Sequence, residues 1–85
     1  MPTVLRVKGY RFVIFTNDHS PPHIHVQHAE GAAKVELDPI SITEHYKLKR
    51  RQLNEIIEIV EENRGYLLEK WQAFQGDENE SANPE

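Results

Sequence analysis

The chain has 85 residues, of which 10 are basic and 14 acidic, so its formal net charge is −4 at pH 7. It contains no cysteine, which excludes disulfides and thiolate metal sites, and no apolar run approaches the roughly 20 residues that cross a bilayer. We therefore expect one small cytoplasmic domain with no membrane segment.

Acidic residues are concentrated at the end of the chain. Four of them lie within residues 76–85, where Ala82 is the one hydrophobic residue, and the other 10 acidic residues balance the 10 basic ones. A segment this polar cannot bury enough apolar surface to order itself. We predict a single domain over residues 1–75 and a disordered acidic tail over residues 76–85.

The first half of the chain has the composition of β-strands, because β-branched and aromatic residues recur between short turn segments. Gly9 marks a tight turn, and residues 17–22 favour a turn as well. The predicted strands cover residues 4–8, 11–16, 23–28 and 33–37, and the alternation of Ile40 and Ile42 indicates a short fifth strand.

After Leu48 the apolar residues recur with the period of a helix. Arg64 interrupts the stripe between Val60 and Leu67, so a kink can fall there. We expect this stripe to pack on the sheet. The fold class is therefore α+β: a four- to five-stranded, mainly antiparallel sheet, followed by one long helix, straight or kinked, that covers one face.

Four of the five histidines fall within ten residues, 19–28, in the run HSPPHIHVQH. Histidine changes its charge near neutral pH and is the commonest protein metal ligand. Successive side chains of a strand point to opposite faces, so Ile24 and Val26 would face the core and His23 and His25 the solvent.

The following strand brings carboxylates and a lysine to the face of these histidines. A hairpin closed by a four-residue loop sets Val26 opposite Val35, which places Glu36 opposite His25. A two-residue slip also keeps the apolar faces matched, so this pairing is favoured rather than forced. In either register the face carries imidazoles beside carboxylates and Lys34.

Three chemistries suit this face, and the sequence leaves them open. His23 and His25 can act as acid and base, with Glu36 to orient a ring. Two histidines and a carboxylate can bind a divalent transition metal, and protonated histidines with Lys34 can hold a phosphate. Spacing fixes no third metal ligand, so we predict no cofactor and keep the metal as an alternative. A solvated polar face without activity is the remaining reading.

A basic run over residues 47–51 opens the predicted helix. Cations at a helix N-terminus oppose its dipole, so stability does not explain them. With Arg6, Lys8 and Arg11 of the first hairpin they can form a phosphate-binding edge, or they can be merely solvated. The residues expected to bind substrate are His19, Lys34, Arg50 and Arg51.

Three segments carry a resemblance to a known family: MPTVLRVKGYRF at the start, NDHSPPHIHV at 17–26, and EENR followed by LLEKW within 61–71. Over residues 1–75 the chain resembles the bacterial family called domain of unknown function 4160. Gly65 departs from the family pattern, which more often has a helix former there. The resemblance implies a small bacterial protein, encoded beside a companion small protein in a toxin–antitoxin-like arrangement, and defines no catalytic residues.

We thus expect a component of a toxin–antitoxin-like module that acts on RNA through the face with His23, His25 and Glu36. A non-catalytic module that binds the companion protein, through a sheet edge or through Ile59 and Tyr66, is the alternative. A metal-binding domain is the second alternative. A homo-oligomer is compatible with all three, and the sequence leaves open whether the protein is an enzyme.

Overall fold

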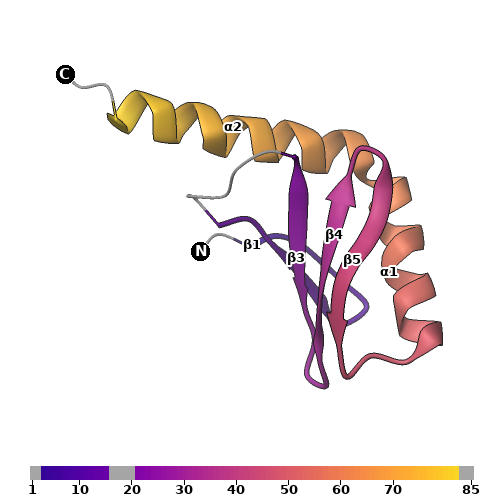
Figure 1. Cartoon of the computed structure of the whole chain (residues 1–85). Helices are drawn as coiled ribbons and strands as arrows, with labels where there is room; N and C mark the ends of the chain where they lie inside the picture. The colour runs from indigo at the N-terminus through magenta and orange to yellow at the C-terminus, as the bar shows by residue number, and fades with distance from the viewer. Residues whose placement is uncertain (1–2, 16–20, 83–85) are drawn as a thin grey trace.

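The computed structural model describes residues 3–15 and 21–82, with side chains described as far as residue 74. Its strands form one antiparallel sheet whose spatial order follows the chain order. The elements in Figure 1 are β1 (Thr3–Val7), β2 (Tyr10–Val13), β3 (His23–Gln27), β4 (Ala32–Leu37), β5 (Ile40–Tyr46), α1 (Arg50–Glu62) and α2 (Arg64–Ala82). The predicted α+β class is confirmed, and the fifth strand has seven residues.

Both helices pack against the same face of the sheet and enclose the core. Alternate residues of the strands supply one side of this core, and the apolar stripe of the helices supplies the other. Its members include Phe12, Ile14, Ile24, Val26, Val35 and Leu37 from the sheet half, with Ile56, Val60, Leu67 and Trp71 from the helices. The opposite face, which carries the alternate residues of the same strands, is called the helix-free face below.

The predicted single helix is divided into two at Asn63. The side-chain amide of Asn63 donates to the carbonyl oxygen of Ile59 (2.8 Å), and its backbone N–H approaches the same oxygen (3.1 Å). Arg64 then starts α2 and donates through Nε to the carbonyl oxygen of Leu37 (2.8 Å), while its guanidinium lies 3.1 Å from the Asp38 carboxylate. The arginine that interrupts the stripe therefore ties the helix break to the end of β4.

Two expectations about the helices have different outcomes. The expectation that the apolar stripe packs on the sheet is confirmed, because Trp71, near the end of the stripe, is only 6% exposed. Ile59 was expected to be accessible to a partner, and this is wrong: it is 4% exposed and belongs to the core cluster. Because α1 packs against both β5 and α2, its buried surface is wider than the stripe indicates. Tyr66 is exposed.

The backbone of α2 continues through Gly76 to Ala82 and extends past the edge of the sheet (Figure 1). It therefore runs into the segment for which the sequence predicts disorder, and the division at residue 75 stays a prediction. Residues 83–85 lie outside the described residues. In the part of the chain that the structure describes, neither helix has the length and apolarity needed to span a bilayer.

The two glycines Gly31 and Gly65 differ in the space around them, which gives a matched test of the fold. A Cβ on Gly31 would collide with the carbonyl oxygen of Tyr46 and lie 2.8 Å from that of Lys47, because the end of β5 passes over the β3–β4 turn. A Cβ on Gly65 would meet nothing within 4 Å. We expect Gly31→Ala to lower the free energy of unfolding by about 1–3 kcal/mol and Gly65→Ala to raise it by about 0.4–1 kcal/mol. Urea unfolding of both variants measures this, and equal effects would contradict it.

We also predict that residues 76–85 are dispensable for folding. The predicted tail has one hydrophobic residue, Ala82, and several acidic ones, so its removal costs little burial. Deleting it is expected to change the melting temperature by about one or two degrees, as surface changes generally do. Loss of a cooperative thermal transition would show instead that this segment contributes to the core.

Candidate functional site

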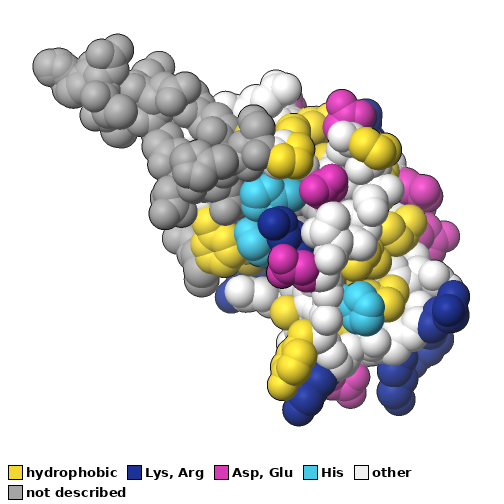
Figure 2. Space-filling model, in the orientation of Figure 1, with side chains coloured by type: hydrophobic (Ala, Val, Ile, Leu, Met, Phe, Trp, Pro, Cys, Tyr) yellow, Lys and Arg dark blue, Asp and Glu magenta, His cyan; other side chains and the backbone are white. Residues whose placement is uncertain are grey.

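β3 brings two histidines to the helix-free face. Ile24 and Val26 are fully buried in the core, so the alternation of side chains directs His23 and His25 to the other side. Figure 2 shows histidine side chains there, next to a basic and an acidic side chain. The predicted face of these two histidines is confirmed.

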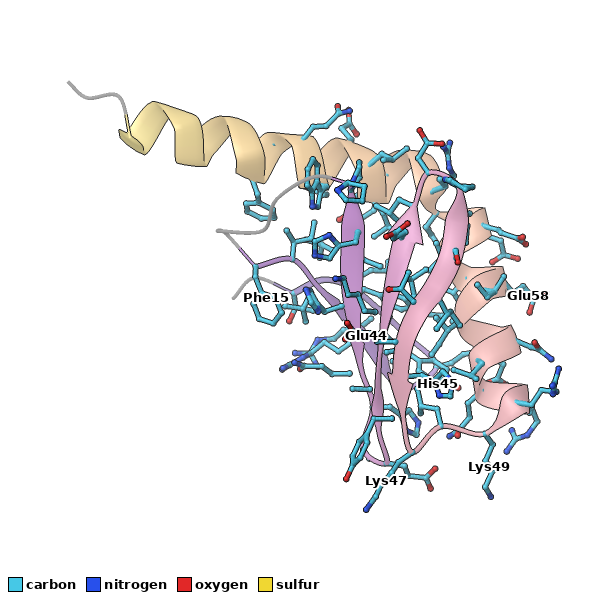
Figure 3. The ribbon with its side chains drawn as sticks, viewed as in Figure 1. Phe15, Glu44, His45, Lys47, Lys49 and Glu58 are labelled. Atoms are coloured by element: carbon cyan, nitrogen blue, oxygen red, sulfur yellow. The ribbon has the colours of Figure 1, made fainter. Side chains whose placement is uncertain are left out.

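The two rings are more covered than predicted. His23 and His25 meet edge to face, with ring centroids 5.0 Å apart and planes at 78°. Phe15, labelled in Figure 3, packs in the same manner on His25 at 4.3 Å. As a result His23 is 7% exposed and His25 half-buried. The expectation that both rings project into solvent is therefore wrong, because aromatic neighbours cover them.

A backbone contact determines the tautomer of His23. Its Nδ1 lies 3.0 Å from the carbonyl oxygen of Pro21. A carbonyl oxygen only accepts, so Nδ1 carries the hydrogen, and in the neutral ring Nε2 carries the lone pair. The next residue, Pro22, accepts a hydrogen bond from the N–H of Leu37 (3.0 Å). The Pro-Pro segment is thus fastened to β4 and holds the His23 ring in place.

The pairing of β3 with β4 differs by two residues from the favoured prediction. His25 lies opposite Lys34, and Glu36 lies opposite His23. The cause is the turn: the N–H of His28 donates to the carbonyl oxygen of Gly31 (2.9 Å), so the hairpin closes more tightly than a loop over 29–32 would allow. The prediction that Glu36 faces His25 is wrong, and the two-residue slip is what the chain adopts.

The pairing of β4 with β5 brings a further carboxylate, Glu44, next to Lys34, which the sequence did not indicate. A bulge between Lys34 and Val35 shifts β5 and sets Glu44 opposite Lys34. Counting along an edge strand cannot reveal such a shift, which explains why Glu44 was missed. We call the resulting line of side chains the central row; it consists of Val13, His25, Lys34 and Glu44.

A hollow of about 210 Å³ lies at the β5 end of the central row. Glu44 and His45, both labelled in Figure 3, are among the residues that β5 contributes to its lining. Its walls combine an imidazole, an ammonium and a carboxylate, so it offers donors and acceptors to a polar ligand. The residues that line it are His25, Ala32, Ala33, Lys34, Glu44, His45 and Tyr46.

The predicted substrate-binding residues do not all come together. Lys34 lies in the central row beside His25. Arg50 and Arg51 lie at the start of α1, and Arg51 is near enough to Tyr10, a core residue, to affect its ionisation. These two arginines therefore belong to the helix side of the sheet and not to the face of the histidines. His19 lies outside the described residues.

The donor set for a metal is incomplete in the described part of the chain. Among these residues, no three side chains of His, Asp or Glu are grouped so that they could hold a metal ion. His23 and His25 are two imidazole donors, and Glu36 lies across from the first of them. The histidine donors that the sequence predicted for a metal site are therefore present. Among the described residues, no third ligand is grouped with them.

A separate polar cluster lies on the helix side of the sheet, around Tyr10. Its hydroxyl donates to a carboxylate oxygen of Glu55 (2.6 Å), and its ring packs 4.9 Å from that of His28. Burial, together with the hydrogen bond to Glu55 and its negative charge, raises the pKa of Tyr10 to about 12, against the opposing charge of Arg51. This cluster links the first hairpin to α1.

Comparison with known proteins gives one match. The model of a family described as "Domain of unknown function (DUF4160)" matches residues 9–72. The matched segment contains β2 to β5, all of α1 and the first turns of α2, and so includes the central row. No curated protein matches the chain. No solved structure matches it either.

Ionisation of Tyr10 is expected to couple to stability at high pH. The hydroxyl ionises at its ordinary value of 10.0 in the unfolded chain and at about 12 in the folded one. As pH rises, the unfolded state therefore loses this proton first. The protonated Tyr10 hydroxyl makes its full contribution to the free energy of unfolding below pH 10, and this contribution is lost as pH rises to about 12. This amounts to about 2–3 kcal/mol. Urea unfolding over this pH range should show the loss in the parent and not in Tyr10→Phe; parallel curves would contradict it.

Proposed function

Since this chain belongs to the DUF4160 family, whose description assigns no activity, we propose a function from the helix-free face. The protein acts on RNA by acid–base chemistry, with His23 and His25 as the reacting pair. The observation that carries this proposal is the edge-to-face contact of the two rings, 5.0 Å apart. Lys34 lies opposite one ring and Glu36 opposite the other.

RNA cleavage requires two proton transfers, which two imidazoles can supply. A base takes the proton of the 2′-hydroxyl as its oxygen bonds to phosphorus, and an acid protonates the 5′-oxygen as its bond to phosphorus breaks. The contact of Nδ1 of His23 with Pro21 places the lone pair of the neutral ring on Nε2, and a ring nitrogen with a lone pair suits the base. His25 is then the acid, and Lys34 stabilises the charge that develops on the phosphoryl oxygens.

The proposed cellular role of this activity, as the toxin of a toxin–antitoxin-like module, rests on the family resemblance. In the proposed two-protein module this chain is the toxin that degrades RNA, and the companion small protein would bind it and block the helix-free face. A shared face for RNA and companion is part of this proposal. The companion would then compete with RNA for His25 and Lys34.

The alternative function, a non-catalytic interaction module, is supported by one edge of the sheet. β5 is an edge strand with mostly exposed residues, and Tyr46 at its end is 64% exposed. A partner strand can pair with such an edge. This alternative uses β5, because Ile59 is buried.

The test is the cleavage of a labelled single-stranded RNA by the parent and by His23→Gln, His25→Gln and His28→Gln. We expect the first two to lose about 100-fold or more in rate, as loss of an acid or base does. His28, whose ring packs against Tyr10 on the helix side of the sheet, is the matched control and should retain the parent rate. The rate should also pass through a maximum with pH, because one ring must be neutral and the other protonated.

Two results would refute the proposal. One is a His25→Gln variant, folded by circular dichroism, that cleaves as fast as the parent. The other is a parent that leaves RNA intact but binds the companion protein, with binding unaffected by His25→Gln and weakened by Tyr46→Asp. That second result would establish the interaction module.

A further inference from the structure

Two arginines face each other on the helix-free face, next to the central row. Arg6 of β1 lies directly opposite Arg11 of β2, and Arg11 lies opposite Gln27 of β3. Gln27 follows His25 by two positions, so it points to the same face one row away, about 7 Å along the strand. We call this line the arginine row; it consists of Arg6, Arg11, Gln27, Ala32 and Tyr46.

The arginine pair does not serve the stability of the sheet. Like charges directly opposite each other destabilise an antiparallel pair. In residues 3–15 and 21–74, whose side chains are described, no carboxylate lies within ion-pair distance of Arg6 or Arg11, whereas Arg64 has such a partner in Asp38. Two neighbouring cations without a counterion are a site for an anion.

The guanidinium of Arg11 is already oriented. It donates to the side-chain oxygen of Gln27, which directs the planar group across the sheet toward β3. Its Nε atom is buried, so a ligand can reach this guanidinium only through its terminal nitrogens. The planar fork of arginine matches the geometry of a phosphate group. Arg6, Lys8 and Arg11 also border a hollow of about 270 Å³ at the first hairpin.

The charges of the two rows differ. In the central row Lys34 has Glu44 directly opposite, and Glu36 follows it by two positions on the same face of β4. The arginine row has two cations and no acidic residue. A polyanion that crosses this face is therefore drawn to Arg6 and Arg11, and lies beside the histidines without contacting the carboxylates first.

Aromatic side chains on this face indicate that the bound strand is single. Phe15 packs on His25 at 4.3 Å, and Tyr46 ends the arginine row with 64% of its surface exposed. Unpaired bases stack on such rings, whereas a duplex keeps its bases inside. Within the row, Arg11 and Tyr46 lie three strand spacings apart, about 14 Å, so one short strand of RNA can contact both.

We infer that Arg6 and Arg11 bind backbone phosphates of single-stranded RNA and hold it across the helix-free face. The inference rests on the proposed action on RNA and names the form of RNA and the residues that bind it. It assigns to Arg6 and Arg11 the phosphate-binding role that we predicted from the sequence for Arg50 and Arg51.

The test measures the binding of a fluorescent, fully 2′-O-methylated single-stranded RNA, which lacks the attacking hydroxyl and stays intact. Anisotropy titrations at a series of salt concentrations compare the parent with Arg6→Gln, Arg11→Gln and the double variant. For each lost phosphate contact we expect weaker binding, and a slope of log affinity against log salt that is shallower by about 0.7. Arg50→Gln and Arg51→Gln are the matched controls and should keep the parent affinity and slope. Circular dichroism checks that each variant is folded.

The outcomes separate this inference from the proposed chemistry. Parent-like affinity and slope in the double variant, or an equal loss in the Arg50→Gln and Arg51→Gln controls, overturn the arginine assignment even if His25→Gln abolishes cleavage. Equal affinity for the corresponding duplex overturns the single-strand assignment. Loss of binding in the arginine variants, with cleavage unaffected by His25→Gln, supports the arginine site and refutes the catalytic pair. A parent that does not bind the probe at low salt overturns both.

Discussion

The burial of Ile24 and Val26 determines what the opposite side of β3 can do. Both side chains are fully buried in a core shared with the helices. A slip of one residue would expose them and bury two imidazoles, at a cost of about 3–6 kcal/mol for the apolar side chains alone. A domain this small has little more stability than that to lose. The two histidines are therefore held on the helix-free face by hydrophobic burial, and no interaction of their own is needed.

The same constraint explains how far the sequence could predict the site. The face of each residue depends on an alternation that is visible in the sequence, and it was predicted correctly for His23 and His25. The residue that lies opposite each histidine on β4 depends on the turn between the strands. A shift of two residues keeps the same side chains buried, so the burial pattern does not distinguish the two registers. Glu36 was therefore placed opposite the wrong histidine, although the register adopted was recognised as an alternative.

Contacts between residues that are far apart in the sequence could not be predicted, for a different reason. The packing of Phe15 on His25 and the bulge that aligns Glu44 depend on how whole strands twist against one another. The placement of Arg50 and Arg51 on the helix side likewise depends on which way the chain turns after β5. The helix break was anticipated, because Arg64 lies where an apolar residue belongs, but its hydrogen bond to Leu37 was not.

The order of the strands has a consequence for folding kinetics. Every pair of neighbouring strands is also consecutive in the chain, so each pairing closes a short loop, and such local contacts form quickly. A sheet with one apolar face must nevertheless bury that face against another element, and here the covering helices come after all five strands. During synthesis the apolar face of the sheet therefore stays uncovered until the part of α2 that contains Trp71 has left the ribosome. The surface with His23 and His25 becomes a defined structure only when translation of the domain is almost complete.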